Sequence, residues 1–208
     1  MGSMEFSAQY QQSPIPAGGN LIRWSWFRFF DTAPRAQCGD RIIVSWDTAI
    51  SSNQLADYSV CAVLLVRGQT MFLLEIIRER VEYPELRRIV ISSHHRWRSI
   101  GVPTSLLIEN KGSGQSLIQD LRQQDIHAIG ITPDGDKVMR MAAQTACIEA
   151  GALHVPRQAP WLDEFKSEIL GFPGSKHDDQ IDALSQALQR AYAPAPPSAI
   201  VGYYNIVR

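Results

Sequence analysis

The chain has 208 residues, of which 45% are hydrophobic and 20% charged, a composition typical of a globular protein with one sizeable core. Its 20 basic and 21 acidic residues give a formal net charge of -1, which excludes a uniformly basic nucleic-acid-binding surface, so any basic patch has to be local. Three cysteines without metal-type spacing indicate a reducing compartment, and no apolar run approaches the roughly 20 residues that cross a bilayer, which excludes a membrane-embedded chain.

The first 40 residues predict no regular secondary structure. The opening Met-Gly-Ser-Met, residues 1–4, is interpreted as a cloning remnant in front of a fragment that starts within a longer protein. Residues 5–40 carry prolines and glycines around an aromatic cluster that shows no clear periodicity. We predict a linking segment whose aromatic side chains pack onto the core or onto an absent neighbouring domain. The cluster comprises Trp24, Trp26, Phe27, Phe29 and Phe30.

From residue 41 onward, β-branched and apolar runs separated by short polar or glycine-containing turns predict three consecutive strands, most of them joined as hairpins. These runs are 42–44, 58–66 and 71–77. A helix of about four turns follows. Pro84 stands in its first turn, where proline is tolerated, and apolar residues continue at helical spacing as far as Trp97.

Short strands and helices alternate in the second half of the chain. The predicted strands are 104–108 and 126–131, and the predicted helices are 115–124, 137–150, 161–170 and 179–192. This alternation predicts an α/β fold with a parallel portion in its sheet. A proline-containing tail, residues 194–208, follows the last helix.

Two acidic residues stand directly after apolar strands. Asp47 ends the first predicted strand, and Glu109 ends the strand 104–108. A carboxylate at such a position needs a partner or a metal, and ligands collect at the carboxyl ends of the strands in open α/β sheets. The alternative is a structural role, because a single acid at a strand or helix end is more often a cap or a salt-bridge partner.

A third acidic group opens the last predicted helix. Asp179 and Asp182 are three residues apart and therefore share one face of that helix, while Asp178 is best interpreted as its cap. Clustered carboxylates are what phosphodiester cleavage by two divalent ions requires, and Mg²⁺ prefers oxygen ligands. From the pattern alone, the metal-ligand and structural interpretations of these acids both stay open.

The order and spacing of several motifs resemble the nuclease domain of phage terminase large subunits. The motifs are Ser45-Trp46-Asp47, Ala56-Asp57-Tyr58-Ser59, Ile108-Glu109-Asn110-Lys111-Gly112-Ser113-Gly114, Gly135-Asp136-Lys137, and Phe172-Pro173 with His177 through Leu184. The resemblance covers roughly residues 5–193 and implies a ribonuclease H-like mixed sheet, three antiparallel strands followed by parallel strands, flanked by helices. It implies a nuclease domain at 41–193, preceded at 5–40 by a linker from an absent ATPase domain.

The resemblance further implies a metal-dependent endonuclease that cleaves concatemeric double-stranded phage DNA during genome packaging, with little sequence preference. Two Mg²⁺ or Mn²⁺ ions are implied. The implied ligands and catalytic residues are Asp47, Glu109, Asp179 and Asp182. The implied partners are double-stranded DNA, the terminase ATPase domain, the portal and the small terminase subunit. The isolated domain is expected to be monomeric and to act in the cytoplasm of an infected or lysogenic bacterium.

Basic residues on the active-site side are expected to contact DNA phosphates. These are Lys111, in a glycine-containing loop after Glu109, and Lys137 and Arg140 at a helix start. His177, Asp178 and Asp57 are auxiliary candidates. Two alternatives remain open: a DNA-gripping or motor-coupling module whose nuclease is silent, and a branched-DNA resolvase of the same fold, because a fold alone does not fix function.

Overall fold

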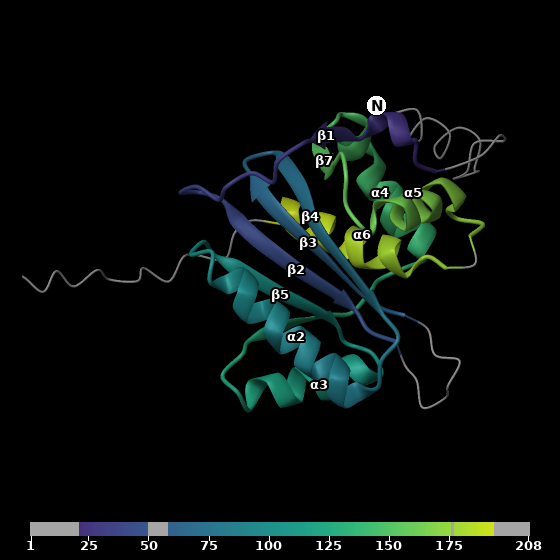
Figure 1. Ribbon diagram of the computed structural model, residues 1–208. Helices are drawn as coiled ribbons and strands as arrows, with labels where there is room; N and C mark the ends of the chain where they lie inside the picture. The colour runs from purple at the N-terminus through teal and green to yellow at the C-terminus, as the bar shows by residue number, and fades with distance from the viewer. Residues whose placement is uncertain (1–20, 50–57, 176, 194–208) are drawn as a thin grey trace, which may run out of the picture.

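A seven-stranded mixed sheet forms the centre of the computed structural model, which describes residues 21–49, 58–175 and 177–193 (Figure 1). The spatial order of the strands is β1-β7-β4-β3-β2-β5-β6. The strands are β1 (Arg28–Phe30), β2 (Arg41–Asp47), β3 (Ser59–Arg67), β4 (Thr70–Glu79), β5 (Thr104–Glu109), β6 (Ala128–Ile131) and β7 (Leu153–Pro156). The helices are the short 3₁₀ helix η1 (Trp24–Trp26), α2 (Tyr83–Arg98), α3 (Ser113–Arg122), α4 (Lys137–Glu149), α5 (Leu162–Gly171) and α6 (Asp179–Tyr192).

Strands β2, β3 and β4 form an antiparallel meander, as predicted, and the neighbouring strands join it in parallel. On one side β2 pairs with β5 and β5 with β6, and on the other β4 pairs with β7 and β7 with β1. Strand β3 lies in the middle and is buried from Ser59 to Val66. A strand buried along almost its whole length has to be covered on both faces, which explains why its sequence is apolar without alternation.

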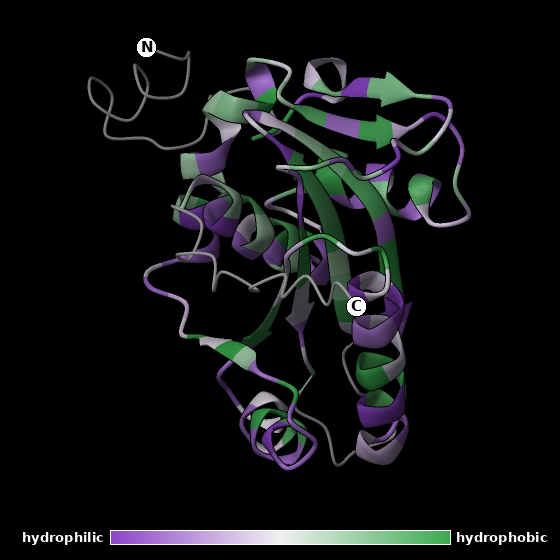
Figure 2. Ribbon diagram, turned by 90° about the vertical axis from the view of Figure 1, so that its left-hand side faces the viewer, coloured by the Kyte–Doolittle hydropathy of each residue, from purple (hydrophilic) through white to green (hydrophobic). Residues whose placement is uncertain are grey.

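Helices cover both faces of the sheet and divide the core into two clusters. Side chains of α4, α5 and α6 pack on one face with residues such as Val60 and Leu64, and those of α2 and α3 pack on the other with Trp46 and Val63. Figure 2 shows the central strands as the most continuously hydrophobic part of the ribbon, with hydrophilic segments concentrated on the helices. The predicted α/β architecture, a mixed sheet flanked by helices, is therefore confirmed.

The two strands β1 and β7 differ from the sequence prediction, which placed no regular element in either segment. β1 lies within the predicted linking segment, so part of that segment belongs to the same sheet. Its neighbours Trp24 and Trp26 pack against the core and Phe27 is buried in it, which confirms that these aromatics pack onto the core. With three and four residues, β1 and β7 are too short to show a period of two. They form because β1 pairs with β7 and β7 pairs with β4.

Helix α6 packs across β2 and β3, and this placement sets up the functional site. Because β2 and β5 are parallel, their carboxyl ends lie at the same edge of the sheet. The N-terminus of α6 is held close to that edge. None of the helices within the described ranges is long and apolar enough to cross a membrane.

Candidate active site

Four acidic side chains from three elements line one cleft of about 640 Å³. Trp46 of β2 is paired with Ile108 of β5, so the residues that follow them, Asp47 and Glu109, are neighbours at the strand ends. Their carboxyl groups share a hydrogen bond. Helix α6 adds Asp179 and Asp182 from its first turn. The structure therefore brings together the four acids that the sequence singled out.

The electrostatics of Asp47 reflect this crowding. Burial raises the pKa of Asp47 well above its usual range, and the hydrogen bond and charge of Glu109 add to the shift, followed by the charges of Asp182 and Asp179. Burial also raises the pKa of Asp182, although the nearby Arg140 guanidinium acts in the opposite direction. A group of carboxylates with so little surrounding water attracts either protons or cations.

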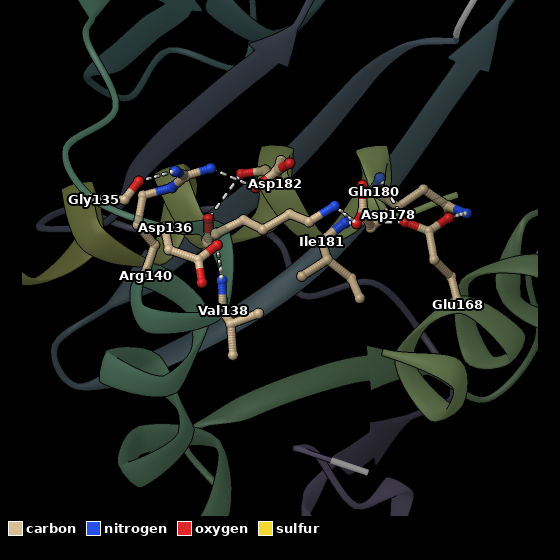
Figure 3. A network of polar contacts seen from close by, with 11 residues as sticks. Gly135, Asp136, Val138, Arg140, Glu168, Asp178, Gln180, Ile181 and Asp182 are labelled. Carbon is tan, nitrogen blue, oxygen red and sulfur yellow. Dashed lines mark hydrogen bonds and ion pairs between the residues drawn. The ribbon is translucent and has the colours of Figure 1, made fainter. Parts of the chain in front are cut away.

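Two basic side chains of α4 neutralise acids of α6. Arg140 donates to the Asp182 Oδ1 atom at 2.7 Å and to the Gly135 carbonyl oxygen at 3.0 Å (Figure 3). Lys137 forms an ion pair with Asp178, and this contact raises the pKa of Lys137. Both bases line the cleft, where a phosphate contact was expected, and both are engaged with carboxylates there. Lys111 is exposed on the same cleft.

The cap of α6 is not the one that the sequence predicted. Asp178 occupies the N-cap position, but its side chain makes no capping hydrogen bond and contacts Lys137 instead. Glu168 of α5 performs this role: its Oε1 atom accepts from the backbone N–H groups of Gln180 at 2.8 Å and Ile181 at 3.2 Å. Sequence reasoning missed Glu168, although its position three residues after Phe165, on the buried face of an amphipathic helix, is a signal that could have revealed it.

The loop after Glu109 packs tightly against the end of β2. Gly112, with a φ of 53°, precedes α3, and the Ser113 hydroxyl donates to the Ala49 carbonyl oxygen at 2.7 Å. A Cβ atom at Gly114 would lie 1.9 Å from the Glu109 carbonyl oxygen and 3.1 Å from the Thr48 hydroxyl. The glycine thus permits the first turn of α3 to approach the backbone of Glu109.

Replacing Gly114 by alanine is expected to destabilise the protein by about 2 kcal/mol, because the added methyl group overlaps a backbone atom that has no freedom to rotate away. Equilibrium urea unfolding measures the change. Gly68→Ala is the control, since Gly68 has a φ of 57° but nothing within 4 Å of a Cβ atom, and only the smaller left-handed penalty of about 1 kcal/mol applies. If both variants lowered the free energy of unfolding by the same amount, a steric role for Gly114 would be contradicted.

The auxiliary candidate His177 lies outside this cluster of acids. The His177 ring stands edge-on to Tyr58, with the ring centroids 5.8 Å apart, and it lines a smaller neighbouring hollow together with Arg78 and Gln180. His177 is not among the residues that line the acidic cleft. Asp57 lies outside the described residues.

The donor set of the cleft fits a hard divalent cation. Carboxylate oxygens are the ligands that Mg²⁺ and Mn²⁺ favour, and a cation would offset the mutual repulsion of carboxylates that burial and neighbouring charges impose on Asp47. Across the described ranges, no three Asp, Glu, His or Cys side chains already stand as a ready coordination group. The Arg140 guanidinium forms an ion pair with Asp182, so a cation bound beside Asp182 would compete with this contact.

A mixed sheet of this topology, with acids at the adjacent ends of β2 and β5 and on a helix across the sheet, defines a ribonuclease H-type α/β domain with an acidic cleft. The family described as the terminase RNase H-like domain matches residues 44–191, and the chain belongs to this family. No curated protein sequence matches the chain.

Solved structures of viral terminases share the fold. The large terminase nuclease of thermophilic phage G20c with bound magnesium has a TM-score of 0.60 and 17% identity, over 84% of this chain and 99% of that chain. The manganese-soaked, inhibitor-bound terminase nuclease domain of human cytomegalovirus has a TM-score of 0.54 and 12% identity, over 72% of this chain and 81% of that chain. The large terminase of another thermophilic bacteriophage has a TM-score of 0.58 and 14% identity, over 81% of this chain and 44% of that chain.

Proposed function

We propose that the chain is the nuclease domain of a phage terminase large subunit, which cleaves concatemeric double-stranded DNA during genome packaging in the host cytoplasm. The observation that carries this proposal is the convergence of four acids on one cleft in a member of the terminase RNase H-like family. Structures of the similar G20c nuclease with bound magnesium, cobalt and zinc support the use of divalent cations. Residues 41–193, together with η1 and β1 of the preceding segment, would form the nuclease domain, and the rest of 5–40 would lead to an ATPase domain.

In this proposal Asp47, Glu109, Asp179 and Asp182 hold two Mg²⁺ or Mn²⁺ ions. When bound, such ions activate a water molecule and stabilise the attacking and leaving oxygens of the phosphodiester. The chain contributes the geometry: β2 and β5 fix two ligands on a rigid sheet edge, and α6 fixes the other two. Arg140 holds Asp182 in place until a cation supplies the positive charge. The cluster of carboxylates thus explains why no histidine or serine nucleophile is needed.

Cleavage of supercoiled plasmid by the purified domain tests the proposal, with Mn²⁺ and Mg²⁺ titrated against an EDTA control. Nicked and linear products that appear only with a divalent ion are the expected result. DNA binding without cleavage under every ion would contradict it and favour the DNA-gripping module. Faster cleavage of a four-way junction than of linear duplex would favour the resolvase. Binding to the proposed packaging partners, the portal and the small terminase subunit, would have to be measured with the full-length protein.

Lys111 is proposed as a phosphate contact because it is exposed on the cleft wall beside the acids. Lys111→Gln is expected to weaken duplex binding and to lower the slope of log affinity against log salt by about one, since one phosphate contact is lost. Fluorescence anisotropy in EDTA measures both quantities. Lys166→Gln removes the same charge from the exposed face of α5, against the Trp24 ring, and serves as the control. If both variants lost the same DNA affinity, a specific contact between Lys111 and a phosphate would be contradicted.

A further inference from the structure

Glu168 is a buried acid that does not line the acidic cleft. It lies on α5 between Phe165 and Ile169, with 6% of its surface exposed. Each of its oxygens is used: Oε1 accepts from the backbone N–H groups of Gln180 and Ile181, and Oε2 accepts from the Gln180 side-chain Nε2 at 2.7 Å. Among the described residues, no lysine, arginine or histidine forms an ion pair with Glu168. Within the ranges that the structure describes, the hydrogen bonds to this carboxylate come from N–H groups of α6.

These N–H groups belong to the first turn of α6, where a helix leaves its backbone donors without intrahelical partners. Leaving a buried donor unsatisfied is costly, so a carboxylate that accepts from two of them ties the helix end to α5. The tied residues, Gln180 and Ile181, stand directly between Asp179 and Asp182 in the sequence. The constraint therefore acts on the backbone that carries both acids.

The same turn is held from a second direction by α4. Arg140 contacts Asp182, and Lys137 contacts Asp178. Figure 3 shows the two sets of contacts on either side of the α6 N-terminus, with Arg140 and Gly135 at one end and Glu168 with Gln180 at the other. The α4 contacts involve the side chains of acids, which a bound cation would compete for. The Glu168 contacts involve backbone and Gln180 atoms, which a cation would leave intact.

We propose that Glu168 is a positioning residue that holds the backbone of the first turn of α6, so that Asp179 and Asp182 stay on the same cleft as Asp47 and Glu109, where their side chains can bind divalent cations. This inference rests on the proposed function of the cleft. It assigns to α5 a role in metal binding although no α5 residue lines the cleft.

The test compares Mn²⁺ affinity in Glu168 variants by titration calorimetry, with hydrogen exchange at the first turn of α6 as a second readout. Glu168→Ala is expected to weaken Mn²⁺ binding by about tenfold or more, as loss of an outer-shell partner does at metal sites. Exchange in the first turn of α6 should accelerate. Glu164→Ala, an exposed acid one turn earlier on the same helix, should leave both readouts unchanged.

Two conservative variants keep the proposal falsifiable if Glu168→Ala does not fold. Glu168→Gln keeps the length and one acceptor oxygen for the two backbone N–H groups. The Gln180 amide can rotate so that its oxygen accepts from the new NH₂ group, so near-wild-type Mn²⁺ affinity is expected. Glu168→Asp keeps the charge but is one methylene too short, so weak binding is expected. If Glu168→Asp bound Mn²⁺ more tightly than Glu168→Gln, the charge of residue 168 would matter more than its hydrogen bonds, and the proposal would be overturned. Wild-type Mn²⁺ affinity in both, with lowered melting temperatures, would reduce Glu168 to a structural cap.

Failure of the proposed function itself gives a different result. If the wild-type protein neither binds Mn²⁺ nor cleaves plasmid, the proposed nuclease function of the cleft is wrong. If the wild-type protein does both and the Glu168 variants bind Mn²⁺ equally well, only the positioning role of Glu168 is wrong.

Discussion

Replacing Asp47 by asparagine is expected to lower the rate of DNA cleavage by about 1000-fold, equivalent to about 4 kcal/mol of transition-state stabilisation. Asparagine has nearly the same shape as aspartate but no charge, so it is a poor ligand for a hard divalent cation. Asp47 lies at the end of β2, shares a hydrogen bond with Glu109 and faces α6 across the cleft. Plasmid cleavage over a range of Mn²⁺ concentrations measures the effect.

The same substitution is expected to raise the melting temperature of the metal-free protein at neutral pH. Burial, together with the charges of Glu109, Asp182 and Asp179, raises the pKa of Asp47. An acid whose pKa is raised in the folded state stabilises the fold below its unfolded pKa, and this contribution is lost as the pH rises towards the folded pKa. The contribution of Asp47 to stability therefore falls from about pH 4 upward, because the unfolded chain gives up the proton that the folded state retains until its raised pKa, and asparagine, which does not ionise, avoids this loss.

Activity and stability should thus move in opposite directions at Asp47, which separates lost chemistry from lost folding. The control is Asp163→Asn, an exposed acid in the first turn of α5, for which neither quantity should change. If Asp47→Asn cleaved plasmid at the wild-type rate, the acidic cleft would not be the catalytic site.

Sequence reasoning located the four acids because each stands at the end of a regular element. Asp47 and Glu109 directly follow apolar strands, and Asp179 and Asp182 open an amphipathic helix. Local patterns could not say that these ends meet. That depends on the parallel pairing of β2 with β5 and on the packing of α6 across β2 and β3, and only the family resemblance indicated it.

The partners of the acids were harder to predict, because they come from other helices. Glu168 lies 12 residues before Gln180, and Arg140 lies 42 residues before Asp182. No periodic pattern relates residues at such separations. As a result, Asp178 looked like the cap of α6, whereas tertiary contacts give that role to Glu168. The ion pair of Arg140 with Asp182 was not foreseen, and its phosphate contact stays a prediction.

Removing the Arg140 guanidinium is expected to destabilise the metal-free protein by about 3 kcal/mol, because Asp182 is then left without its counter-charge in a poorly hydrated site. The Arg140 and Asp182 side chains are only 19% and 18% exposed. Arg140→Gln removes the charge but keeps a polar side chain with the same first two methylene groups. Urea unfolding in EDTA measures the loss, and Arg122→Gln on the C-terminal turn of α3 is the control for removal of one arginine.

A double-mutant cycle with Asp182→Asn decides whether Arg140 acts through Asp182 or through DNA. If it acts through Asp182, the double variant should be about as stable as Asp182→Asn alone. Once Asp182 is neutral, removal of Arg140 no longer leaves a buried carboxylate without its counter-charge. Arg140→Gln should then keep the wild-type salt dependence of DNA binding, whereas a phosphate contact would lower the slope by about one. Mn²⁺ should stabilise Arg140→Gln more than wild type, because a cation among the four carboxylates supplies the positive charge that Arg140 otherwise provides. Equal stabilisation by Mn²⁺ would show that the guanidinium and the cation serve different carboxylates.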